Sequence, residues 1–154
     1  MKKYIEVNSS YKNFYIISED DYIVGVAFSK DEVTNIKEEE TEFLIEAKKQ
    51  LLEYFENKRI EFNLNYKQEG SDFFHKVWDY MEKIPYGKVV TYKDIAIAIN
   101  HSKAFRAVGM ACNRNNIPIF IPCHRVVGQN NKLVGYAGGL DVKEYLLRLE
   151  GYIK

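Results

Sequence analysis

Short runs of β-branched and aromatic residues alternate with polar turns over the first thirty positions of the chain. Residues 4–7, 14–17 and 22–28 form three such runs, and Asn, Ser, Asp and Glu fill the breaks between them. This spacing predicts an antiparallel meander of three short strands. Residues 62–64, Phe-Asn-Leu, are a candidate edge strand of the same sheet.

A helical period follows the strand pattern. Apolar residues recur every three or four positions from Leu44 to Phe55, and Thr41 stands before them as a good N-cap. We expect one helix from Thr41 to about Asn57, packed on the small sheet. Residues 66–70 are polar and end in glycine, which is typical of a linker. The pattern therefore predicts an N-terminal α/β domain at residues 1–70 and a second domain at residues 71–154.

The second domain has mainly helical periodicity. Ser71 can cap a first helix, whose apolar positions are Phe74, Val77, Trp78 and Met81. A closing helix from Asp141 is expected to bury four residues, Val142, Tyr145, Leu146 and Leu149. The chain is thus predicted to have an α+β fold, a small N-terminal antiparallel sheet with a helix followed by a mostly α-helical domain.

Two further helices lie close together in the second domain. Residues 91–94, Thr-Tyr-Lys-Asp, form a capping-box pattern that opens one helix. After a break at residues 100–102, Ser102 can cap another helix that runs from Lys103 to about Asn113. A helix, a three-residue turn and a helix are the spacing of a helix-turn-helix motif.

The most chemically suggestive stretch is the apolar run 117–127, which presents Cys123 directly after a proline. His124 and Arg125 follow, and nearby positive charge favours a thiolate, so we expect the pKa of Cys123 to fall below about 8.5. Equally, Cys123 could be a small buried hydrophobe and His124 a loop histidine with its hydrogen bonds satisfied. These residues alone favour neither interpretation.

Composition and charge narrow the class of protein. Residues 1–70 hold 10 Lys and Arg against 15 Asp and Glu, whereas residues 71–154 hold 12 against 7. This asymmetry suggests that only the second domain meets a polyanion, although chance and helix composition also divide charge unevenly. The two cysteines, Cys112 and Cys123, suggest a free thiol in a reducing compartment rather than a bridge. No His and Cys pairing supports a metal site, and no apolar run approaches a membrane span. We expect a cytoplasmic protein without a metal or cofactor and without a membrane partner.

Two side chains of the helix pair could contact a nucleic acid. Tyr92 lies in the first turn of its helix, where backbone N–H groups favour a phosphate. Arg106 lies opposite Val108, and the small residues Ala107 and Gly109 would let that helix approach a groove. If the helix pair is considered alone, the commoner interpretation is that Tyr92 packs on the core and that Arg106 is simply exposed to solvent.

Six blocks of the second domain stand in an order and spacing that resemble a known family. They are Val77-Trp78, Ile84-Pro85-Tyr86-Gly87 with Thr91-Tyr92, Arg106-Ala107-Val108-Gly109, Ile121-Pro122-Cys123-His124-Arg125-Val126, Gly135-Tyr136 with Gly138-Gly139, and Leu146-Leu147 with Glu150-Gly151. Together they resemble the active domain of the O6-alkylguanine-DNA alkyltransferases. The first domain resembles the ribonuclease-H-like N-terminal domain of that family in outline, which implies a supporting role.

The resemblance implies direct DNA repair by a suicide methyltransferase. O6-alkylguanine would be flipped out of double-stranded DNA, and a monomer would transfer the alkyl group irreversibly to Cys123. His124 would act as base through a water and Glu150 would orient it.

The resemblance also implies roles for the residues around the cysteine. Tyr92 would push on a phosphate and protonate the departing guanine, and Arg106 would fill the gap left in the duplex as its helix enters the minor groove. The remaining implied DNA contacts are Ala107, Gly109 and Arg125, and the implied loop support and base pocket are Asn115, Val126, Tyr136 and Ala137.

Two alternatives belong to other classes of protein. A module that recognises alkylated bases without repairing them is disfavoured by a nucleophile at Cys123. A general thiol enzyme needs only the Cys–His pair, but it gives no account of Tyr92 and Arg106, and it predicts turnover.

Overall fold

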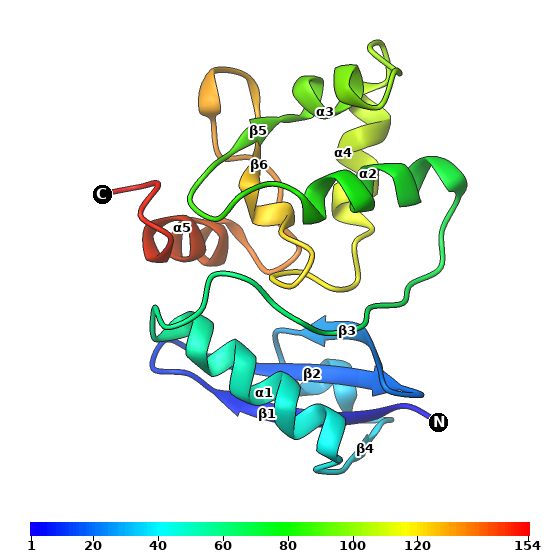
Figure 1. The fold of residues 1–154 in the computed structure, drawn as a ribbon, viewed down its shortest axis with the longest axis vertical. Helices are drawn as coiled ribbons and strands as arrows, with labels where there is room; N and C mark the ends of the chain where they lie inside the picture. Colours follow the sequence, from blue (N-terminus) through cyan, green and yellow to red (C-terminus); the bar gives the residue numbers. More distant parts are fainter. The chain divides into compact units, whose positions relative to one another are not determined.

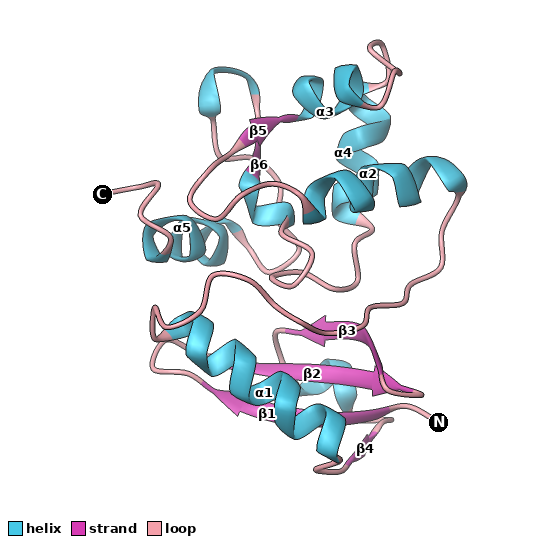
Figure 2. Cartoon of the chain, viewed as in Figure 1, coloured by secondary structure: helices cyan, strands magenta, loops and turns pink.

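A computed structural model describes residues 1–154 and divides the chain into two compact units, Met1–Gln68 and Glu69–Lys154 (Figure 1). The first unit holds a four-stranded sheet and one α-helix, and the second holds four α-helices with a two-stranded sheet (Figure 2). The predicted α+β fold is confirmed. No helix is long and apolar enough to cross a membrane.

The sheet of the first unit contains the expected meander and one strand more. Its strands are β1 (Lys3–Asn8), β2 (Asn13–Glu19), β3 (Tyr22–Ala27) and β4 (Lys37–Glu38). The order is β3-β2-β1-β4, with β1, β2 and β3 antiparallel and β4 parallel to β1. Strand β4 is only two residues long, which is too short for its side chains to alternate visibly in the sequence.

The single α-helix of this unit, α1 (Glu42–Phe55), begins where its cap predicts. The Thr41 hydroxyl accepts a hydrogen bond of 3.1 Å from the Leu44 N–H. The helix packs on β1 and β2, where the rings of Phe14 and Phe55 stack with centroids 5.1 Å apart. A short 3-10 helix, Lys30–Val33, follows β3.

The expected edge strand at residues 62–64 is wrong. The backbone N–H of Asn63 donates to the Gln50 side chain at 2.9 Å, and the amide of Gln50 donates to the Asn63 carbonyl at 3.4 Å. A buried glutamine of α1 therefore satisfies the backbone that a neighbouring strand would otherwise have to satisfy.

The second unit consists of helices around a short parallel strand pair. Its elements are α2 (Asp72–Glu82), β5 (Val90–Thr91), α3 (Tyr92–Ala98), α4 (Phe105–Asn113), the 3-10 helix η2 (Cys123–Arg125), β6 (Val126–Val127), the 3-10 helix η3 (Gln129–Asn131) and α5 (Leu140–Leu149). Ser71 caps α2 and Thr91 caps α3, both as expected. The indole N–H of Trp78 donates to the Ala111 carbonyl at 2.9 Å, which fixes α2 against α4.

The helix pair differs from the prediction at its turn. Residues 99–104 join α3 to α4, and Ala104, not Ser102, is the N-cap of α4. The Ala104 N–H donates to the His101 carbonyl at 2.8 Å, so this segment closes a turn of its own before the helix begins at Phe105.

The strand pair positions the chemistry of the second unit. Strand β5 runs parallel to β6 with Val90 opposite Val126 and Thr91 opposite Val127. Because the strands are parallel, the start of α3, which follows β5, lies beside Gly128, which follows β6, and the cysteine turn, which precedes β6, lies beside residues 88–89, which precede β5.

Candidate active site

Cys123 opens a 3-10 turn at the end of a buried loop. Every residue from 117 to 127 is buried, and the Cys123 N–H donates to the Ile121 carbonyl at 2.8 Å. Asn115 braces the loop from within, because its amide donates to the Ile121 carbonyl at 2.9 Å and its oxygen accepts from the Ile117 N–H at 3.1 Å. The thiol therefore projects from backbone that is held in one conformation.

Ile119 shows how tightly this loop is constrained. Its φ is 74°, in the left-handed region that a β-branched residue adopts only under strain. The side chain is 1 % exposed, so the packing that surrounds it offsets the strain.

Glu150, the C-cap of α5, is the centre of a buried charged network behind the cysteine. One carboxylate oxygen accepts from His124 Nε2 at 2.7 Å and from an Arg125 Nη at 2.9 Å. The other accepts from Arg125 Nε at 2.9 Å and from the Gly87 N–H at 3.0 Å. Burial alone would raise the pKa of Glu150, but the hydrogen bond from His124 and the hydrogen bonds and charge of Arg125 outweigh it and hold the pKa well below its usual range.

This network determines the state of His124. Burial, together with the charges of Arg125 and Lys143, lowers the pKa of His124 more than Glu150 raises it, so the ring is neutral near pH 7. A neutral ring bound to the carboxylate through Nε2 carries its proton there, which leaves the lone pair on Nδ1. Nδ1 makes no hydrogen bond within the chain. It is therefore a basic nitrogen, fixed in orientation and next in sequence to the cysteine.

The expected pKa of Cys123 is wrong in direction. Burial of the thiol raises its pKa, whereas a hydrogen bond from Asn115 and the charge of Lys143 lower it only in part. His124 is neutral and Glu150 neutralises Arg125, so adjacency in sequence brings no net positive charge to the thiol. Ionisation of Cys123 thus requires a base or a bound substrate.

The expected contact of Arg125 with DNA is not supported by its position. The side chain is 8 % exposed, and besides its bonds to Glu150 it donates to the Ile84 carbonyl at 2.7 Å. Its guanidinium also lies over the Tyr86 ring, 5.8 Å from the centroid. All of these contacts face inward because Arg125 compensates the buried carboxylate.

Tyr92 lies beside this site with its hydroxyl inside the protein. The hydroxyl donates to the Val134 carbonyl at 3.2 Å. Burial, followed by the neighbouring Cys112 and Cys123, raises the pKa of Tyr92 to about 12. The phenol is therefore protonated at neutral pH and can act as a proton donor.

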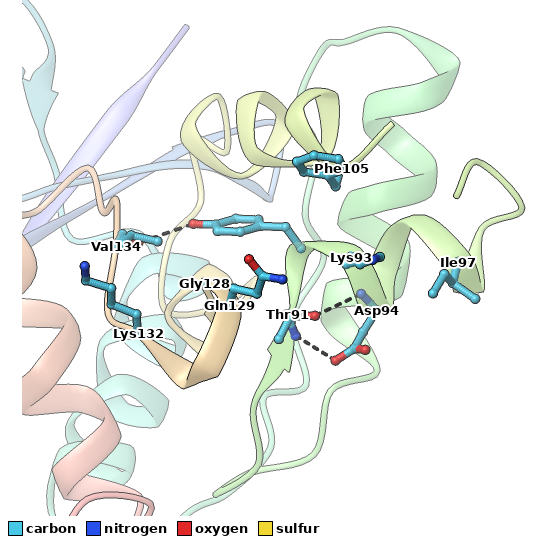
Figure 3. Close-up of a pocket in the computed structure, with 10 residues that line it drawn as sticks. Thr91, Lys93, Asp94, Ile97, Phe105, Gly128, Gln129, Lys132 and Val134 are labelled. Atoms are coloured by element: carbon cyan, nitrogen blue, oxygen red, sulfur yellow. Dashed lines mark hydrogen bonds between the residues drawn. The ribbon is translucent and has the colours of Figure 1, made fainter. Parts of the chain in front are cut away.

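A pocket of about 470 Å³ opens beside Tyr92 (Figure 3). Phe105 and Ile97 lie on one side of it, with Val134 and Lys132 across from them, and Lys93 projects near its rim. The capping hydrogen bonds between Thr91 and Asp94 close its lower edge, at 2.9 and 3.0 Å. An apolar hollow with two exposed lysines suits a ligand that combines an apolar body with negative charge.

The remaining predicted site residues lie on α4, on β6 and in the segment before α5. Arg106 is exposed on α4, and the small residues Ala107 and Gly109 are partly exposed on the same helix. Val126 is fully buried, and Tyr136 approaches Cys123 and Glu150 closely enough for their charges to raise its pKa further beyond the effect of burial. Ala137 is exposed.

Sequence reasoning missed Lys143 and misjudged the inner face of α5. The buried residues of this helix are Val142, Lys143, Leu146 and Leu147, whereas Tyr145 and Leu149 are half-buried. Lys143 stands three and seven positions before Leu146 and Glu150, so helical spacing could have placed it on their face.

The second cysteine is buried away from solvent. Cys112 Sγ lies 3.7 Å from the sulfur of Met81, and both cysteines are unbridged. Burial, followed by the charge of Cys123, raises the pKa of Cys112 far above its ordinary value. No three His, Cys, Asp or Glu side chains gather where they could hold a metal ion.

Two protein-family models match the chain, one to each unit. The model described as the ribonuclease-like domain of 6-O-methylguanine DNA methyltransferase matches residues 2–68. The model described as the DNA binding domain of the same family matches residues 72–152.

Individual proteins with similar sequences and structures carry related names. The constitutive methylated-DNA–protein-cysteine methyltransferase of Bacillus subtilis is 43 % identical over 97 % of this chain and 96 % of its own. A methylated-DNA–protein-cysteine methyltransferase of Methanosarcina barkeri is 53 % identical over 73 % of this chain and 71 % of its own. The crystal structure of Mycobacterium tuberculosis OGT in complex with DNA superposes with a TM-score of 0.88, at 33 % identity over 96 % of this chain and 92 % of that one.

Proposed function

The chain belongs to the 6-O-methylguanine DNA methyltransferase family, whose members transfer a methyl group from DNA to a cysteine of the protein, and we propose that Cys123 is the accepting cysteine. The substrate is guanine that carries an alkyl group on O6 in double-stranded DNA. The reaction repairs the base directly and needs no cofactor.

The observation that carries this assignment is the buried arrangement behind the cysteine. Glu150 fixes His124 through Nε2 at 2.7 Å, and the basic Nδ1 of His124 makes no bond within the chain. A nucleophile followed by an oriented base is the arrangement that activates thiols. Because burial keeps Cys123 protonated in the free protein, this base supplies what the thiol lacks.

The transfer proceeds as a displacement at the alkyl carbon. His124 Nδ1 takes the thiol proton, directly or through one water, and the Cys123 sulfur forms a bond to the carbon. The bond from that carbon to guanine O6 breaks, and its electron pair stays on the guanine. Tyr92, which is protonated at neutral pH, gives a proton to the departing base.

The product explains why each molecule acts once. The alkyl carbon is held on Cys123 as a thioether, and the site contains no group that can cleave a carbon–sulfur bond of this kind. Regeneration of the thiol is therefore absent, and repair is stoichiometric.

Access to the base requires that it leave the duplex. An O6-alkyl carbon cannot be reached inside the base stack, so the nucleotide is flipped out, and exposed Arg106 fills the gap from the minor-groove side. Residues 71–154, which include α4, hold 12 Lys and Arg against 7 Asp and Glu. This positive balance supports binding of the DNA backbone by the second unit.

The pocket beside Tyr92 receives the backbone of the damaged strand. Its apolar wall of Phe105 and Ile97 suits a deoxyribose, and the exposed amines of Lys93 and Lys132 suit the adjoining phosphates. Tyr92 borders both this pocket and the cysteine, so it can act on a phosphate and on the flipped base.

All of these groups lie between residues 69 and 154 of one chain. We therefore propose that the protein acts as a monomer, with residues 71–154 as the alkyltransferase and DNA-binding domain. Its two unbridged cysteines suit the reducing conditions of the cytoplasm, where we propose that it acts. Residues 1–70 support that domain and contribute no reacting group.

The intact mass of the protein tests the proposal. The wild type is incubated with a duplex that contains one O6-methylguanine, beside Cys123→Ser and, as a matched control, Cys112→Ala. The expected gain is one methyl group, about 14 mass units, and never more than one, for the wild type and Cys112→Ala only. Tight binding of the lesion without a mass gain would indicate a recognition module, and repeated conversion of substrate would indicate a general thiol enzyme.

A further inference from the structure

Lys143 is a buried cation for which the reaction just described has no role. It lies on the inner face of α5 and is 1 % exposed. Its amine donates to three backbone carbonyls, those of Val126 at 2.6 Å, Val134 at 2.8 Å and Gly135 at 3.2 Å. No carboxylate is among its partners. A lysine is rarely buried without an ion pair, so this one calls for a specific explanation.

The three acceptors identify the charged form of the side chain. An ammonium has three N–H donors and no acceptor, which matches three carbonyl oxygens. A neutral amine has two N–H groups and would turn its lone pair toward the third oxygen. The geometry therefore favours the protonated form of the lysine, although burial lowers the pKa of Lys143.

The carbonyls belong to two segments on either side of the site. Val126 follows the cysteine turn directly, and Val134 with Gly135 belongs to the segment that leads to Tyr136. One ammonium thus ties the cysteine strand to the loop expected to line the base pocket. Glycine at 135 suits this place, since its φ of 58° lies in the left-handed region that side chains rarely adopt.

The Val134 carbonyl has two donors, Lys143 and the Tyr92 hydroxyl. If Tyr92 gives its proton to a bound base, its own bond to Val134 must break. Lys143 still holds that carbonyl after the exchange, so the loop need not open when the tyrosine turns to the substrate.

Lys143 also supplies the positive charge of the site. The polar and titratable groups around the thiol are Asn115, Tyr92, Cys112, His124, Tyr136 and Lys143. Asn115 is uncharged, His124 is neutral, and the tyrosines and Cys112 can only become negative. Among these groups, Lys143 alone is cationic before the reaction begins, since His124 becomes charged only when it takes the thiol proton. The charge of Lys143 lowers the pKa of Cys123.

We propose that Lys143 is a positioning residue of the transfer reaction, which holds the base-pocket loop while Tyr92 changes partner and stabilises the Cys123 thiolate. This inference rests on the proposed function. It assigns to one ammonium both the geometry of the loop and the charge that favours the nucleophile.

The proposal is tested by the rate of methyl transfer in a single turnover at saturating DNA, measured for the wild type and for Lys143→Met. Methionine keeps an unbranched side chain at this position and removes the charge. The rate of Lys143→Met at pH 7.5 should be at least about tenfold lower, and the rising limb of its rate–pH profile should lie about one pH unit higher. Lys143→Arg keeps the charge, so its limb should stay near that of the wild type. The affinity for DNA should stay within about twofold, because Lys143 does not reach the surface.

Matched measurements separate a role in positioning from general destabilisation. Lys76→Met removes an exposed lysine of α2 and should leave both the rate and the limb unchanged. The inference would be overturned if Lys143→Met loses thermal stability but keeps the rising limb of its rate–pH profile at the wild-type pH and its rate within twofold of the wild type. If the wild type itself transfers no methyl group, the proposed function fails instead.

A second measurement needs no substitution of the lysine. The ammonium of Lys143 can be titrated by proton–nitrogen NMR in the wild type and in Cys123→Ser. Because the thiolate and the ammonium stabilise each other, the lysine should lose its proton at a lower pH in Cys123→Ser. Equal titration midpoints in the two proteins would overturn the electrostatic role, even if Lys143→Met does not fold.

Discussion

Replacing Glu150 by glutamine removes the charge at the centre of the buried network and changes almost nothing in volume. The carboxylate accepts four hydrogen bonds, two from Arg125, one from His124 and one from the Gly87 N–H. Its side chain has no exposed surface, and that of Arg125 is 8 % exposed. Glutamine offers one acceptor oxygen, so its amide must face Arg125 or His124.

The expected loss of stability follows from the charge left behind. Removing one partner of a buried ion pair costs about 3–5 kcal/mol, because the other charge stays buried without compensation. Here Arg125 would keep the Ile84 carbonyl and at most the amide oxygen of the glutamine, and neither of these acceptors carries a charge. With a urea m-value of about 2 kcal/mol/M, the unfolding midpoint of the second unit should fall by roughly 2 M.

Urea unfolding followed by Trp78 fluorescence measures this change, since the single tryptophan lies in the second unit. Glu144→Gln on the same helix is the matched control, because Glu144 and its partner Arg148 are both about half exposed. It should barely move the midpoint. The double variant Glu150→Gln with Arg125→Met buries no unpaired charge and should recover part of the loss. A midpoint for Glu150→Gln as close to the wild type as that of Glu144→Gln would refute the reasoning.

Three further outcomes are expected. The pKa values of His124 and Glu150 are both lower in the folded protein than in the unfolded chain. Their contribution to the free energy of unfolding is therefore complete above the ordinary histidine pKa of 6.5 and declines as the pH falls. A urea midpoint that is constant from pH 7 to pH 4 would contradict this. Asn115→Ala removes two buried hydrogen bonds of the cysteine loop and should lower stability by about 2 kcal/mol and slow methyl transfer; unchanged unfolding and unchanged kinetics would exclude the bracing role. Lys132→Gln should reduce the slope of log affinity against log salt by about 0.9, whereas Lys49→Gln in the first unit should leave it unchanged, and equal slopes would remove the phosphate contact.

Local features of the fold could be predicted well from the sequence. Thr41, Ser71 and Thr91 each cap the helix that follows them, because a hydroxyl at an N-cap binds backbone only three residues away. The three-strand meander is likewise encoded in adjacent runs. These features depend on neighbours in the sequence, so no knowledge of the tertiary structure is needed.

Features decided by distant contacts could not be predicted in the same way. Ser102 has the right side chain for a cap, but the turn closed by Ala104 and His101 delays the helix. Residues 62–64 form no strand because the side chain of Gln50 binds their backbone. In each case a contact outside the local pattern determines the conformation.

The candidate site shows the same division. Cys123 and His124 stand out in the sequence because they follow a proline at the end of an apolar run. The charges around them do not follow from adjacency, since Glu150 neutralises Arg125 from 25 residues away and Lys143 brings its charge from α5. Charge in the folded site is set by distances in space, which the order of residues does not give.

The proposed function depends most directly on which sulfur receives the alkyl group. The protein is incubated with a duplex whose O6-methylguanine carries a deuterated methyl group, then digested, and the label is located by tandem mass spectrometry. The label is expected on Cys123 alone, with one label per molecule and none in Cys123→Ser. Label on Cys112, or full loss of the lesion with no label on the protein, would contradict it.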